Sequence, residues 1–308
     1  MRGLSIRKAA LVLAISMGLP AAHALAASFA NPHLLDSAES LSAKIAQDRE
    51  VRASGGESTL RVIDVRKADV YRAGHIPGSI NVPFTELTDM HAAVEGALKS
   101  DTALAALLGD SGIHHSSQVV IYDDQGGFRA SRLFWLLEYY GHRNVSLLDG
   151  GVDAWIGAGL PLDEGGIASM ADAAREYGRH RPTEFSITRS PRRFASADTI
   201  MNHRYDENTI VVDVRPAAQY ANGHIPWAVN IPWMQNLTPD GMLKSADELM
   251  AHFAGHGITM DSHVIIHCQT GEASAHTYFA MRVVGFSRVR TYHRSWAEWG
   301  SDPSLPKS

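Results

Sequence analysis

The 308-residue sequence contains one cysteine, Cys268, and no excess of basic residues. A single cysteine excludes a disulfide framework within the chain. The formal net charge of −5 at pH 7 argues against a nucleic-acid partner, because nucleic-acid binders usually carry a basic excess. Hydrophobic residues make up 45% of the chain and charged residues 20%, which excludes a disordered or fibrous protein.

The sequence also lacks an apolar run of the roughly 20 residues that a membrane-spanning helix needs. The run at 9–19 is shorter, follows three basic residues and precedes a small-residue A-x-A sequence that ends at Ala26. This order is typical of a secretory signal peptide, which we expect over residues 1–26. A retained signal anchor is the alternative. Cleavage would leave an exported protein without a membrane span, periplasmic if the source is a Gram-negative bacterium.

The rest of the chain consists of two copies of one pattern. Residues 62–83 and 211–232 share D-V-R, a tyrosine, G-H-I-P, an asparagine and a proline at a constant offset of 149. Later segments match at offsets of 145 and 144. A match of this length indicates a tandem duplication. We therefore expect domains at 34–160 and 191–308, joined by a linker over 161–190.

Each copy alternates short runs rich in Val and Ile with amphipathic helical segments. In the second copy, strands are expected at 210–214 and 264–267, and a long helix is expected over 275–284. Strands that alternate with helices predict an α/β fold, with a parallel sheet covered by helices on both faces. Ligands of such sheets bind beyond the carboxyl ends of the strands.

Cys268 lies where an expected buried strand ends and a helix begins. The loop reads C-Q-T-G-E-A-S-A, so its backbone N–H groups and the helix N-terminus could face one point. A thiol there should be largely thiolate at neutral pH. Gly271 permits a tight turn, and Ala273, Ser274 and Ala275 are small enough for the backbone to close around the sulfur. The sequence predicts a nucleophile that needs no histidine base; a buried structural cysteine is the alternative.

Together these features resemble the rhodanese (sulfurtransferase) family in its tandem-domain form. The resemblance rests on D-V-R, G-H-I-P, the C-x-x-G loop and the final S-W-x-E-W-G at 295–300, and it covers nearly the whole mature chain. It implies two tandem rhodanese-like domains, catalysis by the second, and a persulfide on Cys268. Thiosulfate or 3-mercaptopyruvate would donate the sulfur, and cyanide or a thiol, including a protein thiol, would accept it. We expect no cofactor.

The first copy differs from the second at the nucleophile. Asp123 stands where the second copy has its cysteine, and the loop reads D-D-Q-G-G-F-R. A carboxylate is a poor sulfur acceptor, so this domain should be inactive. It resembles the non-catalytic N-terminal domain of tandem rhodaneses, and we expect it to pack against the second domain and shape the cleft.

The donor should meet polar and basic side chains near the loop. In the family, the arginine of D-V-R helps to bind the anionic donor, and Arg215 matches it; its planar guanidinium suits an oxyanion. A structural ion pair with Asp213 is the alternative, because the inactive copy keeps the equivalent Arg66. Gln269 and Thr270 stand where thiosulfate enzymes often carry basic residues, and they could hydrogen-bond the anionic end of a donor.

Two charged residues depart from the family pattern. Glu272 adds negative charge near the thiolate and should point to solvent, since a carboxylate pointing inward would favour the protonated thiol and oppose anionic donors. His293 and Arg294 stand where the family more often has Asp and Gly. Arg294 could supply the positive charge that the loop lacks, so replacing it with alanine should raise the KM for thiosulfate.

Other classes of site are less well supported. Of the 16 histidines, His252 and His256 are four apart on an expected helix, but no third ligand is evident and H-E-x-x-H is absent, so we expect no metal. A cysteine phosphatase would need an arginine six residues after the cysteine, where Ser274 stands. The remaining alternative is a sulfur carrier or protein-binding module that presents the Cys268 persulfide without turnover.

Overall fold

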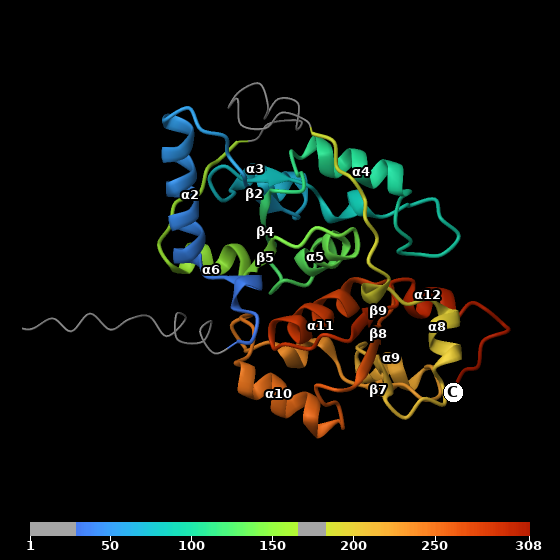
Figure 1. Ribbon diagram of the computed structural model, residues 1–308. Helices are drawn as coiled ribbons and strands as arrows, with labels where there is room; N and C mark the ends of the chain where they lie inside the picture. The colour runs from blue at the N-terminus through green and yellow to red at the C-terminus, as the bar shows by residue number, and fades with distance from the viewer. Residues whose placement is uncertain (1–28, 166–182) are drawn as a thin grey trace, which may run out of the picture.

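The computed structural model describes residues 29–165 and 183–308. The expected signal peptide 1–26 and the middle of the expected linker lie outside the described residues. Figure 1 shows two α/β domains, one in blue and green and the other in yellow to red, with helices packed between the two sheets. None of the helices in the described ranges has both the length and the apolar character needed to cross a bilayer.

The first domain contains a five-stranded sheet in which every neighbouring pair is parallel. In spatial order its strands are β1 (Leu35–Asp36), β5 (Val145–Leu148), β4 (Gln118–Tyr122), β2 (Leu60–Asp64) and β3 (Ile80–Asn81). Its helices are α2 (Ala38–Ala53), α3 (Ala68–Ala73), α4 (Asp101–Asp110), α5 (Ala130–Tyr139) and α6 (Gly151–Gly157). Short 3-10 helices lie at Pro32–Leu34 and Phe84–Leu87.

The second domain repeats this arrangement with four parallel strands. In spatial order they are β7 (Val229–Asn230), β6 (Thr209–Asp213), β8 (His263–His267) and β9 (Val289–Thr291). Its helices are α8 (Ala197–Asn202), α9 (Ala217–Ala221), α10 (Ala246–Gly255), α11 (Glu272–Val283) and α12 (Ser295–Trp299), with 3-10 helices at Pro191–Arg193 and Trp233–Asn236. The helix expected from residue 275 therefore begins three residues earlier.

Alternate residues of each strand belong to different cores, as a period of two requires. In the first domain, Val62 and Val120 join the apolar cluster that α2 and α6 cover. Their neighbours Ile63 and Ile121 join the cluster that contains residues of α4 and α5. Both faces of the sheet are thus covered by helices, and the predicted tandem α/β fold is confirmed.

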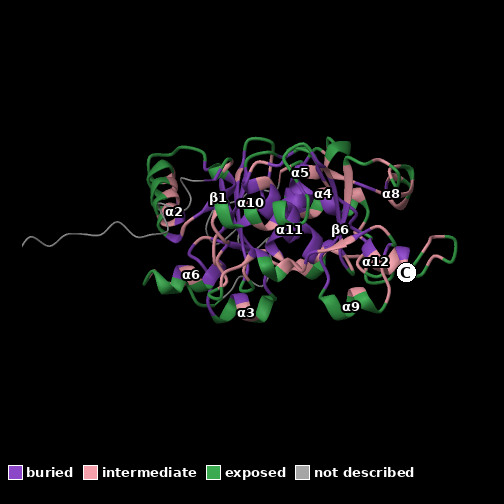
Figure 2. Ribbon diagram, turned by 90° about the horizontal axis from the view of Figure 1, so that it is seen from below, coloured by how far each residue is buried: buried purple, intermediate pink, exposed green. Residues whose placement is uncertain are grey.

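The two domains share one core because α5 and α11 pack against each other between the sheets. The rings of Phe134 and Phe279 meet edge to face with centroids 5.0 Å apart. The carboxylate of Glu138 on α5 accepts hydrogen bonds from Tyr278 and Arg282 on α11. Figure 2 shows both helices in the buried centre of the molecule. This packing brings the start of α11, and with it the loop after β8, against the first domain.

The described part of the expected linker packs onto the first domain. The N–H of Thr183 donates to the carbonyl of Gly109 at 2.9 Å, and that of Thr188 donates to the carbonyl of Tyr140 at 2.9 Å. Phe185 between them is buried in the shared core. The chain thus runs along the first domain before it enters the second.

Candidate active site

Cys268 directly follows β8, at the carboxyl end of the second sheet. Its side chain is 3% exposed and its thiol is free. The N–H of Gly271 donates a hydrogen bond to Sγ at 3.1 Å. The hydroxyls of Ser274 and Ser295 lie 3.7 Å and 3.8 Å from Sγ. The sulfur therefore lies among polar groups at the edge where ligands of parallel sheets bind.

The start of α12 fixes the cysteine loop. The N–H of Cys268 donates to Ser295 Oγ at 3.0 Å, while the N–H groups of Trp296 and Ala297 donate to the carbonyls of Cys268 and Gln269, both at 3.0 Å. Ser295 has φ of +54°, the one positive φ of a non-glycine residue in the described chain. Such backbone strain persists only where surrounding contacts hold it. In the sequence, Ser295 stands out only as the first residue of S-W-x-E-W-G, and its contact with Cys268 is not evident there.

Gly271 makes the turn between the cysteine and α11. Its φ is +99°, and a Cβ at this position would come 2.4 Å from the carbonyl oxygen of His293. Only glycine fits this conformation and this space. The small residues that follow, Ala273, Ser274 and Ala275, are buried. Of the N–H groups expected around the sulfur, the structure brings that of Gly271 within hydrogen-bond distance.

The equivalent loop of the first domain is filled by its own side chain. Asp123 is fully buried, and its carboxylate accepts four backbone hydrogen bonds. The N–H donors belong to Gln125 (2.9 Å), Gly127 (2.9 Å), Arg129 (2.7 Å) and Ala130 (3.0 Å). This loop therefore does bind an anion through converging N–H groups. The carboxylate oxygens of Asp123 reach further into their loop than Sγ of Cys268 does. This explains why Asp123 accepts more backbone hydrogen bonds than the thiol.

A buried arginine of the first domain also reaches the catalytic loop. Arg132 on α5 is 1% exposed; Nη1 donates to the carbonyl of Thr270 at 2.9 Å, and Nη2 donates to the carbonyl of Gly96. Burial lowers the pKa of Arg132, while the nearby Glu272 and Cys268 act in the opposite direction. An arginine remains charged in proteins. The first domain thus places a cation near Cys268, in a position that the local sequence around the cysteine does not indicate.

The sequence predicts that Glu272 points to solvent, but its carboxylate lies near a buried arginine of the first domain. The Glu272 side chain is 24% exposed, and Oε1 lies 4.0 Å from Nη1 of Arg132. The attraction of a buried guanidinium accounts for this orientation, because the carboxylate offsets a charge that burial has removed from water. Glu272 of the second domain therefore interacts electrostatically with Arg132 of the first domain.

Arg215 forms the structural ion pair that was the alternative to donor binding. It is 3% exposed, its Nε donates to both carboxylate oxygens of Asp213 at 3.0 Å, and Nη2 donates to Asp213 at 2.6 Å and to the carbonyl of Gly223 at 2.7 Å. Arg66 makes the same bonds to Asp64 in the first domain. An identical pair in a domain without the cysteine supports a role of the Arg215–Asp213 pair in folding.

The remaining predicted residues lie at the rim of the loop. Gln269 is exposed and Thr270 is half-buried. The guanidinium of Arg294 is 47% exposed and binds the carboxylate of Glu298 at 2.8 Å. Arg294 directly precedes Ser295, which contacts Cys268, yet the charge of Arg294 is partly neutralised by Glu298 of the same helix.

His293 is a buried neutral residue next to the loop. Its ring stacks on Trp135 of the first domain with centroids 5.4 Å apart. Burial, with the charges of Arg132 and Arg294, lowers the pKa of His293 to about 3. The imidazole is consequently uncharged at neutral pH and contributes packing between the domains instead of positive charge.

The histidines of residues 29–165 and 183–308 form no metal cluster. Across the described residues, no group of three or more His, Cys, Asp or Glu side chains could hold a metal ion. The rings of His252 and His256 meet edge to face with centroids 5.3 Å apart. At the position where a phosphatase would place its arginine, the hydroxyl of Ser274 faces the sulfur.

Comparison with known proteins identifies the family. The rhodanese-like domain model matches residues 37–158 and 196–302. The thiosulfate sulfurtransferase of Pseudomonas aeruginosa is 31% identical over 259 residues, which cover 82% of this chain and 92% of that protein. The sulfur carrier protein TtuD of Thermus thermophilus is 30% identical, with 80% of this chain and 90% of that protein covered.

A solved structure agrees with these matches. The 3-mercaptopyruvate sulfotransferase SseA of Escherichia coli superposes with a TM-score of 0.71 at 26% identity, over 86% of this chain and 99% of that chain. Its length and its fold thus correspond to both domains together. The chain belongs to the rhodanese-like family of sulfurtransferases, and it carries two domains of this family in tandem.

Proposed function

We propose that this protein transfers a sulfane sulfur through a persulfide on Cys268. The Cys268 thiolate attacks the outer sulfur of thiosulfate; a new S–S bond forms, the S–S bond of thiosulfate breaks, and sulfite leaves with the electron pair. A nucleophile such as cyanide then attacks the outer sulfur of the persulfide. Thiocyanate leaves and the thiolate returns, which is covalent catalysis in two half-reactions.

The observation that carries this proposal is the equivalence of Asp123 and Cys268. The carboxylate oxygens of Asp123 lie one bond beyond the position that Sγ occupies, and four N–H groups bind them. A persulfide extends Cys268 by one atom in the same way. The matching N–H groups, at an offset of 145, belong to residues 270, 272, 274 and 275 of the second loop. The outer sulfur of the persulfide would lie among these donors, which favour an anion.

The nature of the donor follows from the charges around the loop. Arg132 contributes a buried cation whose field favours the thiolate and an anionic donor. Gln269 and Thr270 at the rim supply hydrogen-bonding groups for the anionic end. We propose thiosulfate as the donor, with 3-mercaptopyruvate as the second candidate, and cyanide or a thiol as the acceptor.

The acceptor and the compartment are part of the same proposal. The segment 1–26 has the pattern of a secretory signal, which supports a periplasmic site of action. The similarity to the sulfur carrier TtuD supports the alternative of a carrier that passes the Cys268 persulfide to a protein thiol. Both alternatives share the persulfide and differ in whether a small acceptor turns it over.

Steady-state kinetics separate the two. With thiosulfate and cyanide both varied, the proposal predicts parallel double-reciprocal lines, since each half-reaction releases its product before the next substrate reacts. Cys268→Ser should abolish thiocyanate formation, while Asp123→Asn, a control in the other loop, should keep kcat. Repeating the assay with 3-mercaptopyruvate ranks the donors. A persulfide that forms without turnover by cyanide would support the carrier, and activity retained in Cys268→Ser would refute both.

A further inference from the structure

A second polar cavity lies at the other end of the C-terminal sheet. It has a volume of about 470 Å³ and opens at the amino ends of β6 and β8 and beside β9. Cys268 follows the carboxyl end of β8, which is five residues long. At about 3.3 Å per residue, the strand separates the two places by roughly 15 Å. The cavity is thus distinct from the sulfur-transfer site.

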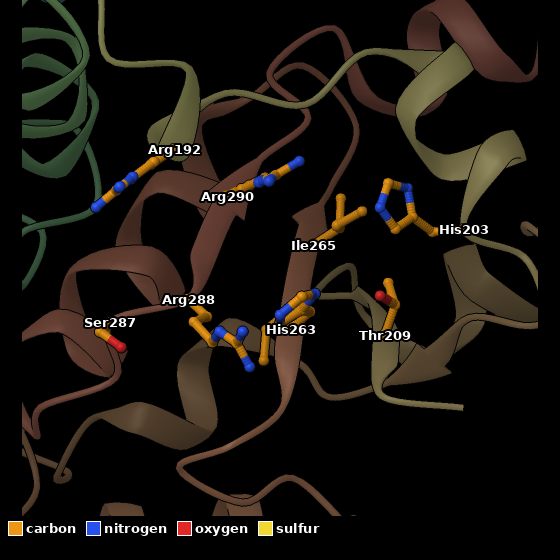
Figure 3. A pocket seen from close by; sticks show the side chains of 9 residues that line it. Arg192, His203, Thr209, His263, Ile265, Ser287, Arg288 and Arg290 are labelled. Carbon is orange, nitrogen blue, oxygen red and sulfur yellow. The ribbon is translucent and has the colours of Figure 1, made fainter. Parts of the chain in front are cut away.

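Basic side chains dominate this cavity. Arg288 and Arg290 stand two residues apart before and within β9, and His263 opens β8. His203 follows α8 and also lines the cavity. Figure 3 shows these four side chains around one hollow, with Thr209 at its edge. The full lining is Arg192, His203, Thr209, His263, Val264, Ile265, Ser287, Arg288 and Arg290.

Among the described residues, no ion pair neutralises the arginines of this cavity. Within 29–165 and 183–308, no acid forms an ion pair with Arg192, Arg288 or Arg290. The single bond from these guanidinium groups, from Arg288 to the carbonyl of Asp261, is long at 3.3 Å.

One neighbouring acid interacts with the histidines but is already engaged. Asp206 interacts electrostatically with His203 and His263. Its carboxylate accepts hydrogen bonds from the N–H of Asn208 at 3.0 Å and from Thr209 Oγ1 at 2.8 Å. The cavity therefore keeps an excess of positive charge and of hydrogen-bond donors that a bound anion would complete.

We propose that this cavity binds a small molecule that carries phosphate groups. Guanidinium groups present parallel N–H donors that match the oxygens of a phosphate, and charge-assisted bonds of this kind are the strongest that surface side chains make. The three arginines and two histidines of the lining exceed what one orthophosphate needs. The volume likewise admits more than one phosphate group, so a diphosphate fits the cavity better than orthophosphate. The lining forms a hollow instead of a flat basic face, which favours a small ligand.

Isothermal titration of the full mature chain with inorganic pyrophosphate tests this proposal. Saturable 1:1 binding is expected, tighter than that of orthophosphate. Each arginine lost from the cavity should weaken binding about tenfold, so the double variant Arg288→Gln/Arg290→Gln should lose about two orders of magnitude. The matched control Arg72→Gln removes the same charge from α3 in the first domain and should bind as the native chain does.

The two sites can be told apart in the same experiment. The double variant should keep its kcat for sulfur transfer, and Cys268→Ser should keep its affinity for pyrophosphate. Circular dichroism checks that the variants remain folded. Absence of saturable binding, or an equal loss of affinity in Arg72→Gln, would overturn the proposal. Binding that disappears in the presence of saturating thiosulfate but survives in the double variant would also overturn it, since it would assign the anion to the catalytic loop.

Discussion

The carboxylate of Asp123 occupies in the first domain the place that the thiol of Cys268 occupies in the second. Both residues follow the equivalent strand of the repeat, β4 or β8, and both side chains are buried. Both accept hydrogen bonds from N–H groups of the loop that follows. One domain therefore fills its loop with its own carboxylate, while the other holds a thiol there, and we propose that the loop of this second domain receives the transferred sulfur.

Replacing Asp123 with asparagine should destabilise the protein without impairing catalysis. The amide retains one acceptor oxygen but turns an NH2 group toward backbone donors, so at least two charge-assisted hydrogen bonds are lost. The free energy of unfolding should fall by about 2–4 kcal/mol. Urea denaturation measures this change. An unchanged midpoint would show that the carboxylate does not hold the loop.

Arg132 should control the reactivity of the cysteine from the other domain. In Arg132→Gln the carbonyls of Thr270 and Gly96 lose their charged donor, and the thiolate loses a nearby cation. We expect kcat/KM for thiosulfate to fall about 10- to 100-fold. The rate of Cys268 alkylation by iodoacetamide should also fall.

Arg132→Lys serves as the matched control, because it keeps the charge. It should restore most of the alkylation rate even where the hydrogen-bond geometry is imperfect. A purely structural role would lower the melting temperature of both variants and leave the alkylation rate of the folded protein unchanged, which would contradict the electrostatic account.

Arg294 offers a contrasting test of charge at the rim. Arg294→Ala should raise the KM for thiosulfate about two- to threefold with kcat unchanged, because an exposed, already paired cation contributes little. Glu298→Gln should have the opposite effect and lower the KM, since it frees the guanidinium while its amide oxygen still accepts from Tyr292. If neither variant shifts the KM, Arg294 has no part in donor binding.

Two buried histidines should make the fold sensitive to acid. Burial lowers the pKa of His276 to about 4, and burial with nearby Arg132 and Arg294 lowers the pKa of His293 to about 3. Unfolded histidines titrate near 6.5, so between this value and the folded pKa the unfolded state binds more protons. The free energy of unfolding should therefore fall as the pH drops below about 6.5, by about 1.4 kcal/mol per pH unit for each histidine.

Asp149 opposes this trend over part of the range. Burial raises its pKa to about 6, so between about 4 and 6 its folded form gains stability as the pH falls. The variant His276→Gln/His293→Gln isolates the histidines, because it should flatten the acid limb by up to about 2.8 kcal/mol per pH unit at pH 5. His91→Gln, at an exposed position, is the matched control. If the free energy of unfolding falls with the same slope below pH 6.5 in the double variant as in the native protein, His276 and His293 are not the cause of the acid sensitivity.

The fold and the position of Cys268 between a strand and a helix could be predicted from the sequence because both depend on local signals. Strand, loop and helix follow one another around Asp123 in the first copy and around Cys268 in the second, and Gly271 takes the positive φ that the turn requires. The helix α2 was not anticipated, since its residues have a weak apolar periodicity and no counterpart of the same length in the second copy. Its length is 16 residues, against six in α8.

The contacts between domains could not be predicted from local patterns. Arg132 and Thr270 are 138 residues apart, and the sequence around Thr270 does not indicate that an arginine donates to its carbonyl. One signal was present: Arg132 stands within the apolar run A-S-R-L-F-W-L-L, where a charged residue implies a specific acceptor. Glu272 was expected in solvent for the same reason, because the guanidinium that attracts it belongs to the other domain.

The intact mass of the mature protein after incubation with thiosulfate tests the central claim most directly. The account predicts a gain of one sulfur atom, mapped to the peptide that contains Cys268 and absent from Cys268→Ser. Added cyanide should remove this sulfur and release thiocyanate. A folded protein whose free thiol gains no sulfur from thiosulfate or from 3-mercaptopyruvate would contradict the persulfide mechanism.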